Sequence, residues 1–159
     1  TVVYSTELGG LTFDSLAKVD GSTGKSGADV IESTVSADIG SLTLVAGMSD
    51  DKVNNVDYKG LGATYNLSEA TTVAFNHTIK ETAANLETKA NEVAVTHVIG
   101  DTTVALGYGE IKDGTAYTTV GATKSITDSF SLYAGYEMQD KIAGSKDISG
   151  MSAGIKLTF

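Results

Sequence analysis

The chain contains no cysteine, no proline and no tryptophan among its 159 residues. The absence of cysteine excludes disulfide frameworks and cysteine-ligated zinc sites, and it leaves the redox compartment unreadable. The two histidines, His77 and His97, cannot build a metal site without carboxylate ligands. The sequence therefore gives no reason to expect a metal or another cofactor.

Basic residues are scarce, with 11 Lys and Arg against 20 Asp and Glu and a formal net charge of -9. Proteins that bind nucleic acid neutralise phosphates with clusters of Lys and Arg. The few basic residues here are scattered along the chain, which argues against a nucleic-acid partner.

Long apolar runs are also missing. The longest stretch without a charged residue covers residues 39–49 and is interrupted by Gly40, whereas a membrane-spanning helix needs about 20 apolar residues. No transmembrane helix is predicted. Thr1 opens directly onto an alternating segment with no basic or apolar leader before it, so we expect any signal peptide to lie outside this sequence.

What the sequence does contain is alternation of apolar and polar residues. About eleven segments alternate, and each is close to the ~9–11 residues that a tilted strand needs to cross a bilayer. Within each segment, every second position tends to hold a large apolar residue, and the positions between hold Gly, Ser, Thr or charged residues. The clearest apolar positions are Val2, Tyr4, Leu8, Leu11, Phe13, Ile31, Val35, Leu42, Leu44, Met48, Val73, Phe75, Val104, Leu106, Leu132, Tyr136, Met151, Ile155 and Leu157. The facing is least certain in residues 92–99, where both parities carry Val.

The connections between these segments alternate in length. Short turns are predicted at Gly9-Gly10, at Gly40, at residues 66–70, at Gly100-Asp101 and at residues 125–129. Longer polar connections are predicted at residues 20–29, 50–57, 80–92, 112–114 and 139–149, with a short helical turn plausible in 80–92. Tight turns at one rim and longer loops at the other predict an all-β, transmembrane, antiparallel up-and-down β-barrel, a single domain over residues 1–159.

A soluble β-sandwich that serves as a binding module is the alternative, because its strands also alternate. A sandwich favours bulky residues on its inner faces, however, whereas many apolar positions here are Ala or Thr. Aromatic residues also gather near strand ends, at Tyr65, Tyr108, Phe130, Tyr136 and Phe159, as in the interfacial girdles of membrane barrels.

Two motifs suggest other chemistry. Residues 21–26 (GSTGKS) resemble the end of a phosphate-binding loop, but the first required glycine is Val19 and the following segment predicts a strand rather than a helix. No Ser/His/Asp constellation can be argued, because the candidate hydroxyls lie in segments predicted as Ser- and Thr-rich strands and not in a strand-to-helix elbow, although barrel hydrolases exist. His77 and His97 are predicted to lie at a rim or interface. The chain is therefore not expected to be an enzyme.

Charged residues on the parity that would face the barrel interior are the most informative candidates for function. They are Glu7, Asp14, Glu32, Asp38, Glu92 and Glu137 together with Lys18, Lys80 and Lys156. They can be read as solvated wall charges or as a pore lining whose field favours cations.

The final residues 154–159 (GIKLTF) resemble the C-terminal strand of Gram-negative outer-membrane proteins. In that family the terminal aromatic and alternating apolar residues, here Phe159, Leu157 and Ile155, signal to the barrel-assembly machinery. Residues 58–67 (YKGLGATYNL) and 44–50 (LVAGMSD) further resemble strands of the trimeric general-diffusion porins of alphaproteobacteria.

This resemblance implies a water-filled homotrimeric channel in the bacterial outer membrane, surrounded by lipid and passing small hydrophilic solutes. It also implies sixteen strands, so the eleven predicted here would be the C-terminal part of a larger barrel. No loop is long enough to be the inward-folded loop of such porins, so their constriction residues cannot be transferred. A small closed barrel with a structural or adhesive role remains an alternative within the same fold class.

Overall fold

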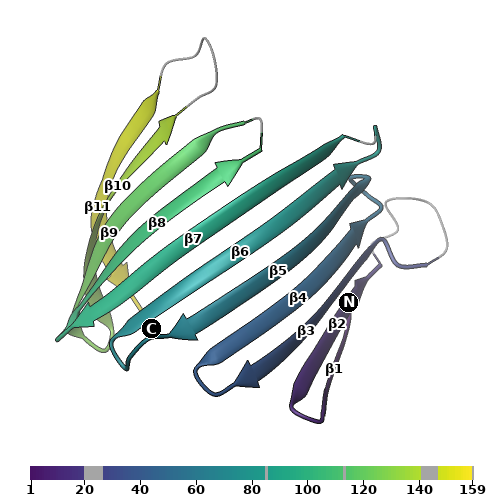
Figure 1. Ribbon diagram of the computed structural model, residues 1–159, viewed down its shortest axis with the longest axis horizontal. Coiled ribbons are helices and arrows are strands. Elements are labelled where there is room, and N and C mark those ends of the chain that lie inside the picture. Colours follow the sequence, from purple (N-terminus) through teal and green to yellow (C-terminus); the bar gives the residue numbers. More distant parts are fainter. Residues whose placement is uncertain (20–26, 85, 113, 141–146, 159) are drawn as a thin grey trace. The chain divides into compact units, whose positions relative to one another are not determined.

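The computed structural model describes residues 1–19, 27–84, 86–112, 114–140 and 147–158, and every regular element in these ranges is a β-strand. The strands are β1 (Val2–Leu8), β2 (Leu11–Lys18), β3 (Val30–Ile39), β4 (Leu42–Asp51), β5 (Val56–Asn66), β6 (Thr71–Thr82), β7 (Glu87–Ile99), β8 (Thr102–Ile111), β9 (Ala116–Thr127), β10 (Phe130–Asp140) and β11 (Ile148–Leu157). Hydrogen bonding joins them in chain order from β1 to β11 (Figure 1). The predicted all-β, up-and-down antiparallel topology with eleven strands is confirmed.

The shortest turns follow from glycine. Gly9 and Gly10 both have positive φ, at 60° and 79°, and join β1 to β2 while Leu8 pairs with Leu11. Two consecutive residues with positive φ match the right-handed twist of the strands that they connect. Gly40 and Gly100, with φ of 62° and 57°, begin the turns between β3 and β4 and between β7 and β8.

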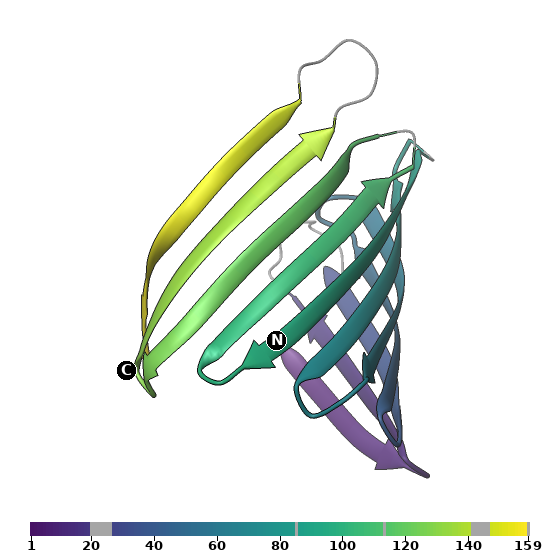
Figure 2. The same cartoon turned by 60° about the vertical axis from the view of Figure 1, so that its left-hand side comes forward.

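The described chain divides into two compact units. Unit 1 comprises Thr1–Thr64 and Asn76–Ala90, and unit 2 comprises Tyr65–Phe75 and Asn91–Phe159. In unit 1, β1 to β4 pair antiparallel with continuous registers. In unit 2, β8 to β11 also pair antiparallel, and Figure 2 shows these four strands side by side. A bulge between Phe130 and Ser131 interrupts the pairing of β10 with β9.

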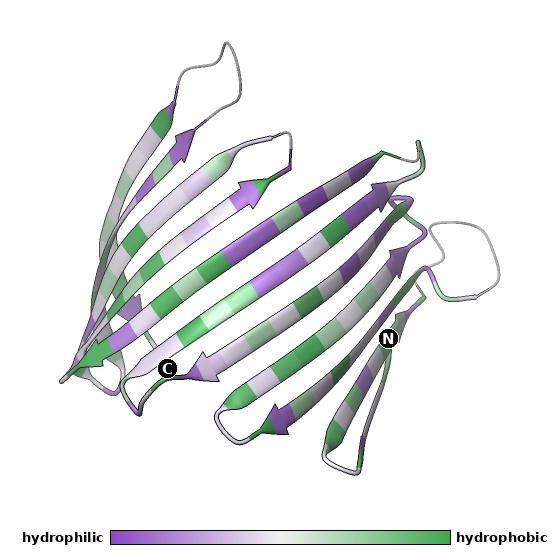
Figure 3. Ribbon diagram, viewed as in Figure 1, coloured by the Kyte–Doolittle hydropathy of each residue, from purple (hydrophilic) through white to green (hydrophobic). Residues whose placement is uncertain are grey.

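The registers sort the side chains of each unit onto two faces, since directly opposed residues of neighbouring strands point to the same side. In unit 1, Phe13 pairs with Val35 and Val35 with Ala46, so the apolar positions share what we call the apolar face. In unit 2, Leu106 pairs with Val120, Val120 with Tyr136 and Tyr136 with Met151. The opposite face of each unit is the polar face, and the alternation along the strands is visible in Figure 3.

No hydrophobic side chain among the described residues is buried. Met151 on the apolar face of unit 2 is 87% exposed, Ile155 62% and Leu44 of unit 1 40%. A β-sandwich would bury such residues against a second sheet, and no second sheet is present in the described ranges. The structure therefore lacks a core of its own and gains its order from strand-to-strand hydrogen bonds.

Polar side chains on the apolar face form hydrogen bonds with one another and with the backbone. Ser15 and Ser33, a directly opposed pair on β2 and β3, place their Oγ atoms 3.1 Å apart, and the Ser15 hydroxyl also donates to the Glu32 carbonyl at 3.2 Å. Paired hydroxyls of this kind satisfy part of the hydrogen-bonding capacity of serine on a face that is otherwise apolar.

Several predicted connections differ from the structure. The helical turn expected in residues 80–92 is wrong, because β6 extends to Thr82, β7 starts at Glu87, and Thr82 N–H donates to the Leu86 carbonyl at 3.2 Å. The connection expected at 50–57 shortens to 52–55, where the Asp51 carboxylate accepts 3.0 Å hydrogen bonds from the N–H groups of Val53 and Asn54. The turn expected at 125–129 shrinks because β9 continues to Thr127. No helix among the described residues is long and apolar enough to cross a membrane.

Candidate functional site

The polar face of unit 1 carries the charged residues predicted for β1 to β3. Asp14 pairs with Ser5 and Thr34, and Glu32 pairs with Leu16 and Ser49. Glu7 lies opposite Thr12, and Asp38 lies opposite Thr43, whose hydroxyl donates to the Asp38 carboxylate at 2.5 Å. Lys18 lies on the same face, because it belongs to the parity of Asp14 on β2. The register therefore brings Glu7, Asp14, Lys18, Glu32 and Asp38 to one side, and all five are exposed.

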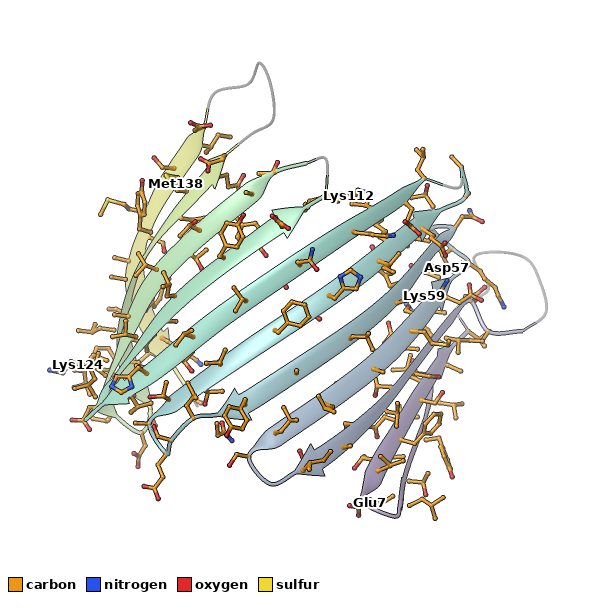
Figure 4. All side chains as sticks on the ribbon, in the orientation of Figure 1. Glu7, Asp57, Lys59, Lys112, Lys124 and Met138 are labelled. Carbon is orange, nitrogen blue, oxygen red and sulfur yellow. The ribbon has the colours of Figure 1, made fainter. Side chains whose placement is uncertain are left out.

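A shallow hollow of about 340 Å³ lies on this polar face, over β3 to β6. Glu32, Tyr58, Asn76 and Thr78 contribute polar groups to its lining, and Gly47, Gly60 and Gly62 keep it open. The ammonium of Lys80 lies 5.8 Å from the centre of the Tyr58 ring, which places this lysine on the same face. Figure 4 shows Asp57 and Lys59 near the start of β5 and Glu7 at the end of β1.

The polar face of unit 2 carries a row of small side chains. One row across four strands consists of Ala105, Gly121, Gly135 and Ser152, each directly opposite the next. A hollow of about 560 Å³ lies over this row, with Glu137 and Gln139 at its margin. Small side chains leave space above a sheet that bulky ones would fill. Glu137 pairs with Thr119 and Gly150, and Lys156 pairs with Ser131, so both predicted residues lie on this face.

Glu92 on β7 lies on the same face, where it is hydrogen-bonded to Tyr117, a residue that was not predicted to be functional. The hydroxyl of Tyr117 on β9 donates a hydrogen bond to the Glu92 carboxylate Oε1. Gly109 of β8 is directly opposite Tyr117 in the register, and the Tyr117 ring covers it. The facing of residues 92–99, which was least certain from the sequence, is thereby settled for Glu92.

No group of three His, Cys, Asp or Glu side chains that could hold a metal ion occurs in the described part of the chain. His97 shares a 2.8 Å hydrogen bond between its Nδ1 and the Thr71 hydroxyl, at the turn-side ends of β7 and β6. This position agrees with the predicted location at a rim.

Two sequence motifs fall partly or wholly outside the described residues. The glycine-rich residues 21–26 lie there, and so does Phe159. Ile155 and Leu157, predicted with Phe159 as an assembly signal, lie on the apolar face, where Ile155 pairs with Leu132 and Leu157 with Phe130. They are 62% and 57% exposed.

Two further groups were missed by sequence reasoning. Asp29 is the one charged residue that is almost fully buried among those described, at 2% exposure, and its backbone N–H donates to the Lys18 carbonyl at 2.7 Å. Lys59 and Glu81 form a 3.0 Å ion pair between β5 and β6. Both side chains are well exposed, so the pair contributes little stability. No pattern along the chain could have revealed either feature, because both depend on contacts between distant residues.

Scans of the sequence against models of protein families and against curated proteins give no match. Solved structures do match. The anion-selective porin of Comamonas acidovorans is 17% identical, with a TM-score of 0.81 over 99% of this chain and 58% of that porin. A triple mutant of the Rhodopseudomonas blastica porin is 17% identical, with a TM-score of 0.73 over 99% of this chain and 54% of its own. The chain thus spans somewhat more than half the length of these porins, and at these identities the likeness establishes the fold.

Proposed function

From the porin fold of nearly the whole chain, we propose that this protein forms the wall of an outer-membrane porin, a water-filled channel through which small hydrophilic solutes and ions diffuse passively. The observation that carries the proposal is the contrast between the two faces of each unit. One face exposes large apolar side chains, and the other exposes small and charged ones.

The apolar faces suit contact with lipid. In hydrocarbon every backbone N–H and C=O must be paired, and antiparallel strands joined edge to edge meet that demand. Exposed apolar side chains such as Leu44, Leu132 and Ile155 are unfavourable in water. Moving them from water into a bilayer gains about 25 cal/mol per Å² of apolar surface. Bacterial barrels of this architecture occur in the outer membrane.

The polar faces suit contact with water. A small closed barrel fills its interior with side chains, whereas the row Ala105, Gly121, Gly135 and Ser152 and the glycines Gly47, Gly60 and Gly62 leave open hollows. This favours a channel over a closed barrel with a structural or adhesive role. A channel of this kind performs no chemistry, so no enzymatic activity is proposed.

The complete channel would contain more than these eleven strands. Both solved porins are longer, with this chain covering 58% and 54% of them. We therefore propose that residues 1–159 are one part of a single, larger barrel domain, about sixteen strands in all. By the resemblance of its closing strand, the protein would be inserted by the barrel-assembly machinery and would assemble as a homotrimer surrounded by outer-membrane lipid.

The charges on the polar faces would give the pore a weak preference for cations. The polar face of unit 1 carries four of the acids named above and two of the lysines. The polar face of unit 2 carries the other two acids and one lysine. The porin of Comamonas acidovorans is anion-selective although its fold is the same. The proposed preference therefore rests on the charges that this chain carries on its polar faces and not on the shared fold.

Liposome swelling tests the proposal. The full-length protein, purified from outer membranes and reconstituted, should admit sugars at rates that fall as the sugar grows, as expected for an open aqueous pore. Protein-free liposomes and liposomes with heat-denatured protein serve as controls. Swelling at the control rate for the smallest sugars would favour the closed barrel instead.

A further inference from the structure

Tyr117 lies flat against the sheet of unit 2 instead of standing away from it. It is directly opposite Gly109 in the β8 and β9 register. A Cβ atom at Gly109 would come within 2.6 Å of Cε1 of the Tyr117 ring, closer than real side chains approach. Gly109 is buried, although it lies on a single-layered sheet, because the ring covers it. The glycine therefore provides the space in which the ring lies.

The hydroxyl end of the ring is fixed as well. It donates to Oε1 of Glu92 on β7, so the side chain spans the width of β8 between two strands. On its other side Tyr117 pairs in register with Gln139 of β10, whose amide donates to the Glu137 carboxylate at 2.6 Å. Both acids of this face are thus held by neighbouring side chains, one by Tyr117 and one by Gln139.

We propose, resting on the porin function proposed above, that Tyr117 is a positioning residue for ion passage. By lying across Gly109 it keeps the lumen wide at this level, and through its hydroxyl it holds the Glu92 carboxylate at one place on the wall. A carboxylate fixed at the wall presents a constant field to passing ions, whereas a freely moving one spreads its charge over many positions. Tyr117, Gly109 and Glu92 together would then set both the local width of the pore and part of its cation preference.

The width is tested by single-channel conductance of the full-length protein in planar bilayers. Gly109→Ala should displace the ring into the lumen and lower the unitary conductance. Gly121→Ala adds the same methyl group to the same face, where its nearest contact would be an ordinary 3.6 Å, and so measures the effect of a methyl group alone. The loss in Gly109→Ala should exceed that in Gly121→Ala, and the double variant Gly109→Ala with Tyr117→Ala should recover the conductance.

The charge is tested by reversal potentials in a salt gradient, a measurement that a purely structural role of Tyr117 would not change. Glu92→Gln should lower the cation preference. Tyr117→Phe, which keeps the ring and removes the hydroxyl, should shift it in the same direction, and the double variant should shift it no further than Glu92→Gln does. Neither substitution adds bulk, so this test remains if Gly109→Ala fails to assemble.

The outcomes separate this proposal from the porin function. A wild-type protein that forms no channels contradicts the porin function itself. A conducting wild type whose Gly109→Ala and Gly121→Ala variants conduct alike would overturn the proposed role of the ring. Unchanged selectivity in Tyr117→Phe, or additive shifts in the double variant, would overturn the proposed role of the hydroxyl.

Discussion

The ring of Tyr133 on β10 covers Gly154 of β11, its directly opposed partner, so closely that a Cβ atom at Gly154 would meet the Tyr133 hydroxyl at 2.5 Å. This pair repeats, on other strands of unit 2, the relation between Tyr117 and Gly109. In both cases a glycine on the polar face accommodates a tyrosine from the neighbouring strand.

Gly154→Ala should consequently destabilise the protein. The added methyl group must displace the ring from its place over Gly154, and the loss of a cross-strand side-chain contact costs about 0.2–1 kcal/mol. Gly150→Ala is a matched control on the same strand and face, since nothing lies within 4 Å of a Cβ atom there. Urea unfolding of both variants in detergent or lipid measures the difference. Equal unfolding midpoints for the two variants would show that stability does not depend on the space that Gly154 leaves for the Tyr133 ring.

Arginine should discriminate the two faces of β4. Leu44 lies on the apolar face, paired with Ala37, and Val45 lies on the polar face, paired with Ser36. Leu44→Arg should lower the free energy of unfolding in lipid by up to about 2–4 kcal/mol, the cost of Arg at the bilayer midplane. Val45→Arg, which points into water, should cost much less. Equal tolerance of the two substitutions would overturn the assignment of the faces.

Much of this fold could be predicted from the sequence because alternation is a local property. Each strand shows its own period of two, and the Gly9-Gly10 and Gly100-Asp101 turns are marked by residues that adopt positive φ. The face on which Leu44, Leu132 or Glu137 lies follows from the alternation within its own strand, without knowledge of the neighbouring strands. That is why the predicted faces agree with the registers.

Features that depend on neighbours could not be predicted in this way. Residues 80–92 favour a helix by their own propensity, but hydrogen bonding to adjacent strands extends β6 and β7 into them. The pairing of Tyr117 with Gly109 and Glu92 joins three strands, and nothing along the chain marks it. The burial of Asp29 likewise arises where the segment before β3 meets residues near Lys18 and Lys52.

Phe159 should affect assembly more than final stability. By resemblance its role is recognition of the unfolded chain, which precedes folding in the membrane. Phe159→Ala should therefore slow the appearance of folded protein in outer membranes, while the unfolding midpoint of the protein that does assemble stays close to that of the wild type. Pulse labelling in cells follows this rate. Assembly of Phe159→Ala at the wild-type rate would contradict the role taken from the family.

Ion preference should depend on salt concentration. The two polar faces carry six acids and three lysines in total. Charges in contact with water are screened over about 10 Å at 0.1 M salt and about 3 Å at 1 M. The permeability ratio of potassium to chloride should therefore exceed one and should rise as the salt is diluted. A constant ratio across salt concentrations would mean that these residues do not face the ion path.

Single-channel recording of the full-length protein in a planar bilayer tests the central claim most directly. An outer-membrane porin should produce discrete, ohmic conductance steps that persist in solutions of different salts, grow with bulk conductivity, and shrink when polymers small enough to enter the pore are added. A protein that inserts into the bilayer as folded β-structure and yet produces no such steps would contradict the account and identify a closed barrel.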